Sequence, residues 1–216
     1  MDKSYIFYDL DGTLTDPKEG ITKSIQYGLR GVGVEEDNLD NLIKFIGPPL
    51  KESFTRYYGF DDAMADAAIV KYREYYSEKG IFQNSLYDGV GNLLAKQHKD
   101  GKKIVLATSK PLYYARIILE HFEIEEYFTF ASGSEMNGDR VKKAEVIAYA
   151  MENCGLTSGK DAIMVGDRMH DIVGAQTMGM DSVAVLYGYG SREELEEQGP
   201  TYLVETVAGL GNLLEE

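Results

Sequence analysis

The amino-acid sequence predicts an α/β protein in which a parallel sheet, covered by helices on both faces, is interrupted near its start by a small all-helical unit. Two observations carry this prediction. After residue 89, short apolar segments of strand length alternate with helical segments, as expected of strands joined by helical crossovers. Between about residues 16 and 79, by contrast, the hydrophobic spacing is helical throughout.

The first element expected is a buried strand at residues 5–10, a short apolar run rich in aromatic residues. The run ends in acidic residues and Gly12, which favour a loop. A helix is expected next, with Asp16 as its N-cap, Pro17 at the first helical position and Glu19 at the reciprocal capping position. The acidic residues of the loop therefore follow directly after a buried strand.

The helical unit continues with segments whose apolar residues recur at helical spacing, separated by turns that contain glycine or proline. These helices are expected at residues 39–46, 50–58 and 62–78. Later in the chain we expect helices at residues 90–99, 112–121, 141–153, 171–178, 192–198 and 207–214, and strands at 103–107, 127–131, 162–165, 182–186 and 202–204. Two domains follow: residues 16–84 form the helical one, and residues 1–15 with 85–216 form the α/β core.

Composition narrows the classes of partner. The 216 residues include 36 acidic and 22 basic side chains, a formal charge of −14 at pH 7, so most of the surface should repel nucleic acid and anionic membranes. The longest apolar run, residues 146–151, is far shorter than the roughly 20 residues of a membrane helix. Because the N-terminus lacks a secretory leader and Cys154 is the single cysteine, we expect a cytoplasmic protein. Its expected state is a monomer or a homodimer, and the sequence does not decide between the two.

Polar residues follow several of the predicted strands. They are Asp9 and Asp11 after the first strand, Thr108, Ser109 and Lys110 after the second, and Asp167 and Asp171 after the fourth, with Lys143 at the start of the intervening helix. Ligands of open parallel sheets bind at the carboxyl ends of the strands, so these residues are the candidates for chemistry. Asp9 and Asp11 are two residues apart, and their carboxylates point the same way on an extended backbone.

Carboxylates gathered in this way repel one another unless a cation lies between them. Oxygen ligands with no histidine or cysteine nearby favour Mg²⁺. The same group contains a lysine, a hydroxyl and backbone N–H groups, which can offset the charge of a phosphoryl group during transfer. The residues thus indicate an anionic phosphate held on Mg²⁺ beside a nucleophilic aspartate.

Four motifs stand in order along the chain. They are DLDGTLT at residues 9–15, VLATSK at 105–110, KAEVI at 143–147 and GDRMHD at 166–171. Together they resemble the four motifs of the haloacid dehalogenase (HAD) superfamily. The resemblance covers essentially the whole chain, and it implies a Rossmann-like core with an inserted all-helical cap domain.

The resemblance implies catalytic roles for particular residues. Asp9 corresponds to the nucleophile that takes the phosphoryl group as an aspartyl phosphate. Asp11 corresponds to the general acid that protonates the leaving group and then to the base that activates water. Thr108 and the backbone of Ser109 correspond to groups that hold phosphate oxygens, and Lys143 to the lysine that offsets charge on the nucleophile and the phosphate.

The resemblance also implies a metal site. The side chains of Asp9 and Asp167 and the backbone carbonyl of Asp11 correspond to the Mg²⁺ ligands. Asp171 corresponds to a residue that bonds a metal-bound water or the catalytic lysine. Dehalogenase members of the superfamily lack the second aspartate and need no metal, so the presence of Asp11 favours phosphate chemistry.

Two parts of the resemblance leave alternatives open. The third motif lacks its frequent prolines, so Lys143 is favoured over the adjacent Lys142 without excluding it. Residues 45–51 are similar to the cap loop of phosphoglycolate phosphatases and can present Gly47 or Lys51 to the substrate. A simple turn between two helices explains the same residues equally well.

The function that these expectations favour is a Mg²⁺-dependent phosphatase, a phosphomonoester hydrolase of a small phosphorylated metabolite. The resemblance is greatest to phosphoglycolate phosphatases and nucleoside 5′-monophosphatases, the 5′-nucleotidases. A phosphosugar mutase on the same scaffold, or a non-catalytic switch based on a phosphorylated aspartate, are the alternatives. The identity of the phosphate ester does not follow from the sequence.

Overall fold

The computed structural model describes residues 3–215, and these contain a six-stranded sheet with all neighbouring strands parallel. The strand order across the sheet is β5-β4-β1-β6-β7-β8. The strands are β1 (Tyr5–Tyr8), β4 (Lys103–Pro111), β5 (Phe128–Ser134), β6 (Ala162–Gly166), β7 (Asp181–Val185) and β8 (Tyr202–Val204). The predicted α/β fold with a parallel sheet is confirmed.

Strand β1 lies between β4 and β6, which are distant from it in sequence. Tyr8, its last residue, lies opposite Leu106 of β4 and Val165 of β6. The residues that follow these three positions are therefore level with one another. This register brings Asp9 and Asp167 to the same edge of the sheet, where the carboxyl ends of the strands meet.

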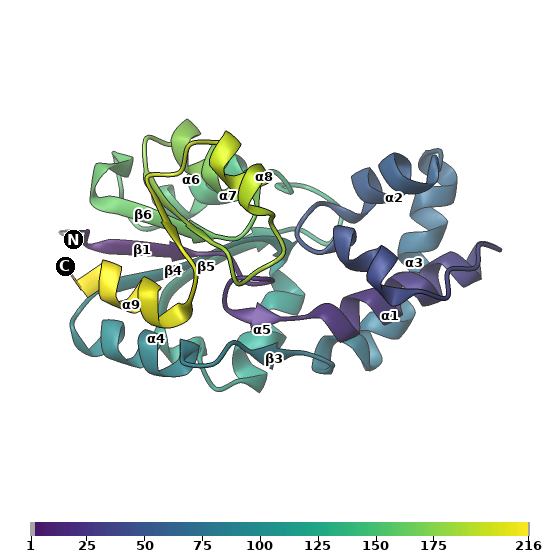
Figure 1. The fold of residues 1–216 in the computed structure, drawn as a ribbon, viewed down its shortest axis with the longest axis horizontal. Coiled ribbons are helices and arrows are strands. Elements are labelled where there is room, and N and C mark those ends of the chain that lie inside the picture. The colour runs from purple at the N-terminus through teal and green to yellow at the C-terminus, as the bar shows by residue number, and fades with distance from the viewer. Residues whose placement is uncertain (1–2, 216) are drawn as a thin grey trace. The chain divides into compact units, whose positions relative to one another are not determined.

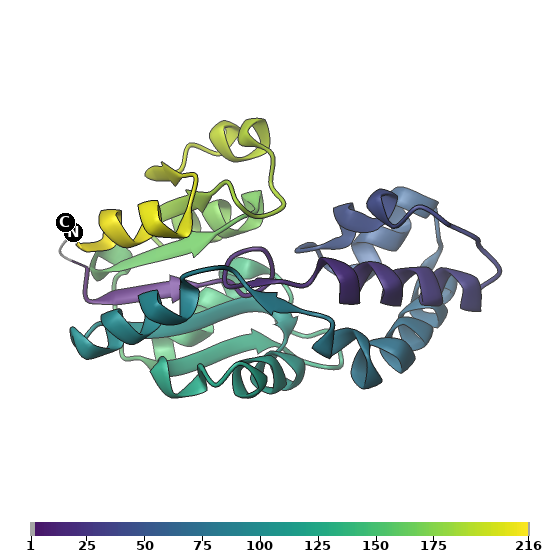
Figure 2. The same ribbon diagram turned by 60° about the horizontal axis from the view of Figure 1, so that its bottom comes forward.

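Helices cover both faces of this sheet. They are α4 (Val90–Lys99), α5 (Leu112–His121), α6 (Lys143–Asn153), α7 (Met169–Thr177), α8 (Arg192–Glu197) and α9 (Val207–Glu215), with short 3₁₀ helices η3 (Glu125–Tyr127) and η4 (Gly159–Asp161). Figure 1 shows α6, α7 and α8 on one side and α4, α5 and α9 on the other. Helices α4 and α9 contact each other, and Figure 2 shows them from a second direction.

The core lies where the central strands meet α6 and α7. Phe7, Val105 and Met164, from three neighbouring strands, pack with Val146 and Ile147 of α6, and all five are fully buried. Because helices cover both faces, the strands carry nearly continuous apolar runs instead of an alternating pattern. This packing fixes the sheet edge that carries the polar residues.

The described residues divide into two compact units. One runs to Asp16 and resumes at Leu86, and the other runs from Pro17 to Ser85. The second unit contains α1 (Lys18–Gly31), α2 (Leu50–Tyr58), α3 (Asp62–Glu78) and the 3₁₀ helices η1 (Leu39–Phe45) and η2 (Gly80–Phe82). It is a helical insertion after the first strand. The segment expected as a helix at residues 39–46 is thus a 3₁₀ helix.

Two short strands, β2 (Thr15–Asp16) and β3 (Ser85–Leu86), pair with each other where the chain leaves and re-enters the α/β unit. The expectation that Asp16 caps the first helix is wrong. The N-cap of α1 is Pro17, without a side-chain capping bond, and the carboxylate of Asp16 instead accepts a hydrogen bond from the hydroxyl of Tyr189. A partner distant in sequence has displaced the local cap.

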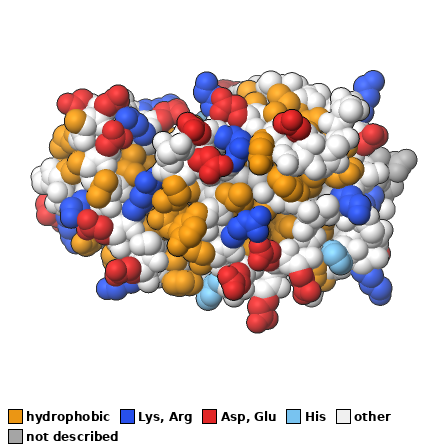
Figure 3. Space-filling model, turned by 180° about the vertical axis from the view of Figure 1, so that it is seen from behind, with side chains coloured by type: hydrophobic (Ala, Val, Ile, Leu, Met, Phe, Trp, Pro, Cys, Tyr) orange, Lys and Arg blue, Asp and Glu red, His pale blue; other side chains and the backbone are white. Residues whose placement is uncertain are grey.

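Within residues 3–215, we find no helix with both the length and the apolar character needed to cross a membrane. On the face drawn in Figure 3, acidic and basic side chains are interspersed. The structure also contains exposed ion pairs between residues four positions apart, such as Lys96 with Asp100 and Arg192 with Glu196.

Candidate active site

The carboxyl ends of β1, β4 and β6 bring the polar residues of the four motifs into one cluster. Three carboxylates, those of Asp9, Asp167 and Asp171, each place an oxygen within 4.8 Å of the others. All three side chains are buried. Such close acidic groups repel one another, and the cluster therefore requires compensating positive charge.

Burial and mutual repulsion raise the pKa values of two carboxyl groups in this cluster. Burial raises the pKa of Asp167 well above its ordinary value, and the neighbouring carboxylates of Asp171 and Asp9 raise it further. Burial also raises the pKa of Asp171 to about 6, although the adjacent ammonium of Lys143 opposes the shift. A cation bound between these oxygens would stabilise their charged forms.

Lys143, the first residue of α6, supplies part of the compensating charge. Its ammonium lies 2.8 Å from Asp9 Oδ1 and 2.8 Å from Asp171 Oδ1, and it donates a hydrogen bond of 2.9 Å to the carbonyl of Ala107. Burial lowers the pKa of Lys143, but the two carboxylates outweigh it and raise the pKa above its ordinary value. The adjacent Lys142 is exposed.

Asp11 is not one of these three carboxylates, although it interacts electrostatically with Asp9, and it pairs with a different cation. The ammonium of Lys110 is 2.5 Å from Asp11 Oδ2, and both side chains are at least nine-tenths buried. Burial raises the pKa of Asp11, and the ion pair with Lys110 opposes this shift. The sequence motif contains Lys110, but sequence reasoning assigned it no role.

A bulge at the end of β4 contains Thr108, Ser109 and Lys110, the last of which pairs with Asp11. Ala107 and Pro111 are four residues apart on β4, whereas their partners on β5, Ser132 and Ser134, are two apart. The extra residues leave the regular ladder, and a bulge of this kind redirects side chains. The predicted phosphate-binding residues therefore stand on an irregular segment that the sequence alone does not reveal.

The loop between β7 and α8 holds Asp167. The backbone N–H of Tyr189 donates to Asp167 Oδ2 at 2.8 Å, and the Thr13 hydroxyl donates to Oδ1 at 3.4 Å. Side chains at Gly12 or Gly188 would overlap Asp167, and Gly12 also has a φ of 80°, which favours glycine. The sequence analysis assigned residues 188–190 no role at the site, although the two glycines that flank Tyr189 are a signal for a close backbone approach.

The chemistry of the cluster fits a divalent metal ion. Among residues 3–215, it combines four carboxylates, those of Asp9, Asp11, Asp167 and Asp171, with two ammonium groups, those of Lys110 and Lys143. Two negative charges remain uncompensated within this group. The triad of buried carboxylates offers only oxygen donors, which suit hard cations, and it is therefore a candidate metal site.

The two residues proposed from the cap loop lie in the helical insertion. Gly47 has a φ of 101° and serves the turn before α2. Lys51 lies 3.1 Å from Asp66 Oδ1 and 3.7 Å from Asp62 Oδ1, so it has partners within its own unit. Their contact with a substrate stays a prediction.

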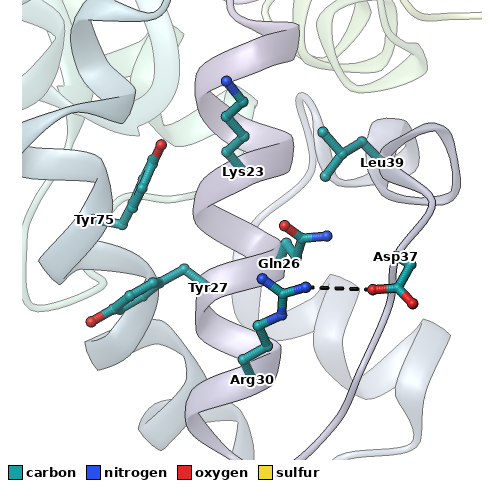
Figure 4. A pocket seen from close by; sticks show the side chains of 7 residues that line it. All are labelled: Lys23, Gln26, Tyr27, Arg30, Asp37, Leu39 and Tyr75. Atoms are coloured by element: carbon teal, nitrogen blue, oxygen red, sulfur yellow. Dashed lines mark hydrogen bonds and ion pairs between the residues drawn. The ribbon is translucent and has the colours of Figure 1, made fainter.

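The helical insertion also contains an open pocket of about 460 Å³. Its lining residues are Lys23, Gln26, Tyr27, Arg30, Asp37, Leu39 and Tyr75, shown in Figure 4. Lys23 pairs with Glu19, and Arg30 pairs with Glu35 and Asp37. None of the candidate catalytic residues lines this pocket.

Several known proteins are similar to this chain in sequence or in fold. A 5′-nucleotidase of Pseudomonas aeruginosa is 42% identical over 210 residues, which are 97% of this chain and 95% of that protein. The tyrosine-protein kinase PtkA of Mycobacterium tuberculosis is 39% identical over 97% of this chain and 71% of its own. A crystal structure of a predicted phosphatase from Clostridium acetobutylicum superposes with a TM-score of 0.96 at 45% identity, covering both chains completely.

The family comparison agrees with these relatives. The model of the haloacid dehalogenase-like hydrolases matches residues 6–185, a span that begins in β1 and ends with β7. It includes every motif residue of the acidic cluster and the helical insertion. On this match and on the parallel sheet that supports it, the chain belongs to the haloacid dehalogenase-like hydrolase family.

Proposed function

We propose that this hydrolase is a Mg²⁺-dependent phosphatase that cleaves monoesters of small phosphorylated metabolites, with nucleoside 5′-monophosphates as the first candidates. The observation that carries the proposal is the buried Asp9 carboxylate, paired with Lys143 and close to Asp167 and Asp171. The likeness to a 5′-nucleotidase over almost the whole chain supports the choice of substrate.

In the proposed first step, Asp9 is the nucleophile. One of its carboxylate oxygens attacks phosphorus, and the bond between phosphorus and the ester oxygen breaks. The electron pair of the broken bond stays on the ester oxygen, which takes a proton from the carboxyl group of Asp11. The products are a free alcohol and an aspartyl phosphate on Asp9.

In the proposed second step, Asp11 acts as a base. Its carboxylate takes a proton from a water molecule, the water oxygen attacks phosphorus, and the bond to Asp9 breaks. Inorganic phosphate is released and both aspartates return to their starting states. Burial raises the pKa of Asp11, which suits a group that must hold a proton before it gives it up.

Thr108 and Ser109 are the proposed phosphate-binding residues. The Thr108 side chain is buried, and its oxygen accepts a hydrogen bond from the backbone N–H of Lys110 at 3.2 Å. The hydroxyl proton can therefore be donated to a phosphate oxygen. Lys143, held between Asp9 and Asp171, compensates charge on the nucleophile and on the phosphoryl group.

The proposed Mg²⁺ ligands are the side chains of Asp9 and Asp167 and the backbone carbonyl of Asp11. Asp171, which belongs to the same cluster, orients Lys143 or a water bound to the metal. When bound, the metal ion supplies positive charge beside the phosphate oxygens. The hydrogen bonds from Tyr189 and Thr13 hold Asp167 in place for this task.

The helical insertion is proposed to act as a cap that selects substrates by their leaving group. In this proposal Gly47 and Lys51, on the segment before and within α2, contact the part of the substrate beyond the phosphate. A cap that covers the site also limits the access of water.

A panel of phosphate esters tests the proposal. AMP, UMP, phosphoglycolate and glucose phosphates are each incubated with the wild-type protein and Mg²⁺, and inorganic phosphate is measured. We expect release of phosphate from at least one ester, and none after addition of EDTA or in the Asp9→Asn variant. Formation of sugar-phosphate isomers without release of phosphate would indicate a mutase. Transfer of the phosphoryl group to a protein tyrosine would indicate a kinase, and an acyl phosphate that is stable for hours would indicate a switch.

A further inference from the structure

We propose that Lys110 is a second catalytic lysine of this site, one that acts on the leaving group, whereas Lys143 acts on the nucleophile. This inference rests on the proposed phosphatase function and assigns a role to a residue that it leaves unused. The structure carries it through three features: the ion pair of Lys110, the free oxygen of its partner, and the bulge that positions it.

The two lysines serve different aspartates. Lys143 lies 2.8 Å from Asp9 and from Asp171. Lys110 lies 2.5 Å from Asp11, and its side chain is 7% exposed. A long cationic side chain loses both hydration and rotamer freedom when it is buried in this way, so its place needs a strong electrostatic partner.

The partner of Lys110 has one oxygen to spare. Asp11 Oδ2 pairs with Lys110, while Asp11 Oδ1 is buried and, within residues 3–215, has no hydrogen-bond partner. The spare oxygen is the one available to hand a proton to the departing ester oxygen. A proton donor must approach that oxygen to about 3 Å. The ammonium of Lys110, 2.5 Å from the other oxygen of the same carboxylate, is in this proposal close enough to act on the leaving group as well.

The bulge in β4 is built to hold Lys110 in this position. The Ser134 hydroxyl donates to the carbonyl of Ser109 at 2.8 Å, and the N–H of Lys110 donates to the Thr108 hydroxyl at 3.2 Å. A side chain at Gly133 would have its Cβ only 2.7 Å from the carbonyl oxygen of Lys110. On the neighbouring strand β5, Gly133 therefore leaves room for the bulge and Ser134 holds it by a hydrogen bond. Specific support of this kind is typical of a bulge that positions a functional side chain.

The proposed action of Lys110 is electrostatic. As the bond between phosphorus and the ester oxygen breaks, its electron pair moves onto that oxygen, which becomes negative until the proton of Asp11 arrives. Lys110 stays protonated throughout and stabilises this charge in a buried site, where such an interaction is stronger than in water. The balance of the step is unchanged: the ester, the Asp9 carboxylate and the proton of Asp11 give the alcohol, the aspartyl phosphate and the Asp11 carboxylate.

This role makes a specific prediction about substrates. The leaving group of an alkyl phosphate, such as a nucleoside 5′-monophosphate, is a strongly basic alkoxide, and its developing charge needs stabilisation by Lys110. The leaving group of an aryl phosphate such as p-nitrophenyl phosphate is a weakly basic phenolate, which needs little stabilisation. The ratio kcat/KM reports all steps through formation of the aspartyl phosphate, the stage at which the leaving group departs.

The test compares Lys110→Met with wild type on AMP and on p-nitrophenyl phosphate. We expect kcat/KM to fall by about 100-fold or more for AMP and by less than about 10-fold for the aryl ester. Across substituted phenyl phosphates, the dependence of kcat/KM on leaving-group pKa should become steeper. Lys110→Arg should restore part of the loss for AMP because it retains the charge. Lys142→Met, which removes an exposed lysine, should behave as wild type.

Equal losses on both substrates would show that Lys110 has only a structural role and would overturn the inference, as would undiminished activity towards AMP. Circular dichroism monitors folding of each variant, and Lys110→Gln replaces the methionine variant if that one does not fold. A wild-type protein that cleaves no phosphate ester would instead refute the proposed function itself. The two failures are therefore distinguishable.

Discussion

Replacement of Lys143 by methionine removes a buried cation from between two carboxylates and leaves the size of the side chain almost unchanged. The Lys143 side chain is 3% exposed, and the side chains of its partners Asp9 and Asp171 are 7% and 2% exposed. Loss of one member of a buried ion pair costs about 3–5 kcal/mol, because the remaining charge is left without compensation. We expect a loss of this size in the free energy of unfolding at pH 8.

The effect should shrink at pH 5. Burial already raises the pKa of Asp171 to about 6 when Lys143 is present, and removal of the lysine raises it further. Asp171 of the variant therefore carries more negative charge at pH 8 than at pH 5, where it binds a proton in the folded state and its repulsion with the neighbouring carboxylates is relieved. The stability contributed by protonation is thus present at low pH and is lost as the pH rises through the raised pKa.

Urea unfolding without added metal, monitored by circular dichroism, measures the free energy of unfolding of Lys143→Met and of wild type at pH 5 and at pH 8. Lys142→Met is the control, because it removes an exposed lysine next to Lys143. The phosphatase kcat of Lys143→Met should also be lower than that of wild type by roughly 10²–10³-fold. A destabilisation below about 1 kcal/mol at pH 8, or one that is larger at pH 5, would refute this account of the cluster.

Three further predictions concern the metal site and the insertion. Mg²⁺ at 100 times its dissociation constant should stabilise the fold by about 2.7 kcal/mol. The affinity for Mg²⁺ should rise from pH 5 to pH 8, because burial raises the pKa of Asp167 and Asp171 and protons compete with the metal at low pH. Thermal unfolding with increasing Mg²⁺ at each pH measures the affinity, and an affinity that falls as the pH rises contradicts the prediction. Gly12→Ala should abolish the stabilisation by Mg²⁺, because the added Cβ would overlap Asp167. The control is Gly155→Ala, at a φ of 69° with open space around it, which should lose only about 1–2 kcal/mol of unfolding free energy and keep the response to Mg²⁺. Equal behaviour of the two variants in a metal titration would refute the steric argument. Lys51→Ala should raise KM for the nucleotide more than it lowers kcat, and steady-state kinetics that show no change in KM would remove Lys51 from the substrate site.

Much of the fold follows from hydrophobic periodicity. The helices expected at residues 62–78, 90–99 and 112–121 are present with the same bounds. These segments are long or strongly amphipathic, and sequence patterns identify such elements best. Residues 39–46 show the same spacing but form a 3₁₀ helix, since a short segment between two turns is shaped by its neighbours as much as by its own pattern.

The convergence of the acidic residues depends on strand order, which periodicity does not contain. Asp9 and Asp167 meet because β1 pairs with β6, and the bulge of β4 approaches them because β1 also pairs with β4. The motif spacing made these residues candidates. The sheet makes them neighbours.

Other contacts had no local signal at all. The pairing of Lys110 with Asp11 depends on two residues that leave the regular ladder of β4, and the bond from Tyr189 to Asp16 joins positions 173 residues apart. In both cases a tertiary partner decides what the side chain does. Sequence reasoning favours the nearest role, such as an N-cap for Asp16, and it was wrong there for that reason.

The central claim is that Asp9 receives the phosphoryl group. Brief incubation of the wild-type enzyme with a substrate and Mg²⁺, followed by acid quenching, reduction with borohydride and peptide mass spectrometry, tests it directly. The account predicts that Asp9 is converted to homoserine only when substrate is present, and that Asp9→Asn shows no such product. Steady phosphate release while Asp9 stays unmodified, or trapping at another carboxylate, would contradict it.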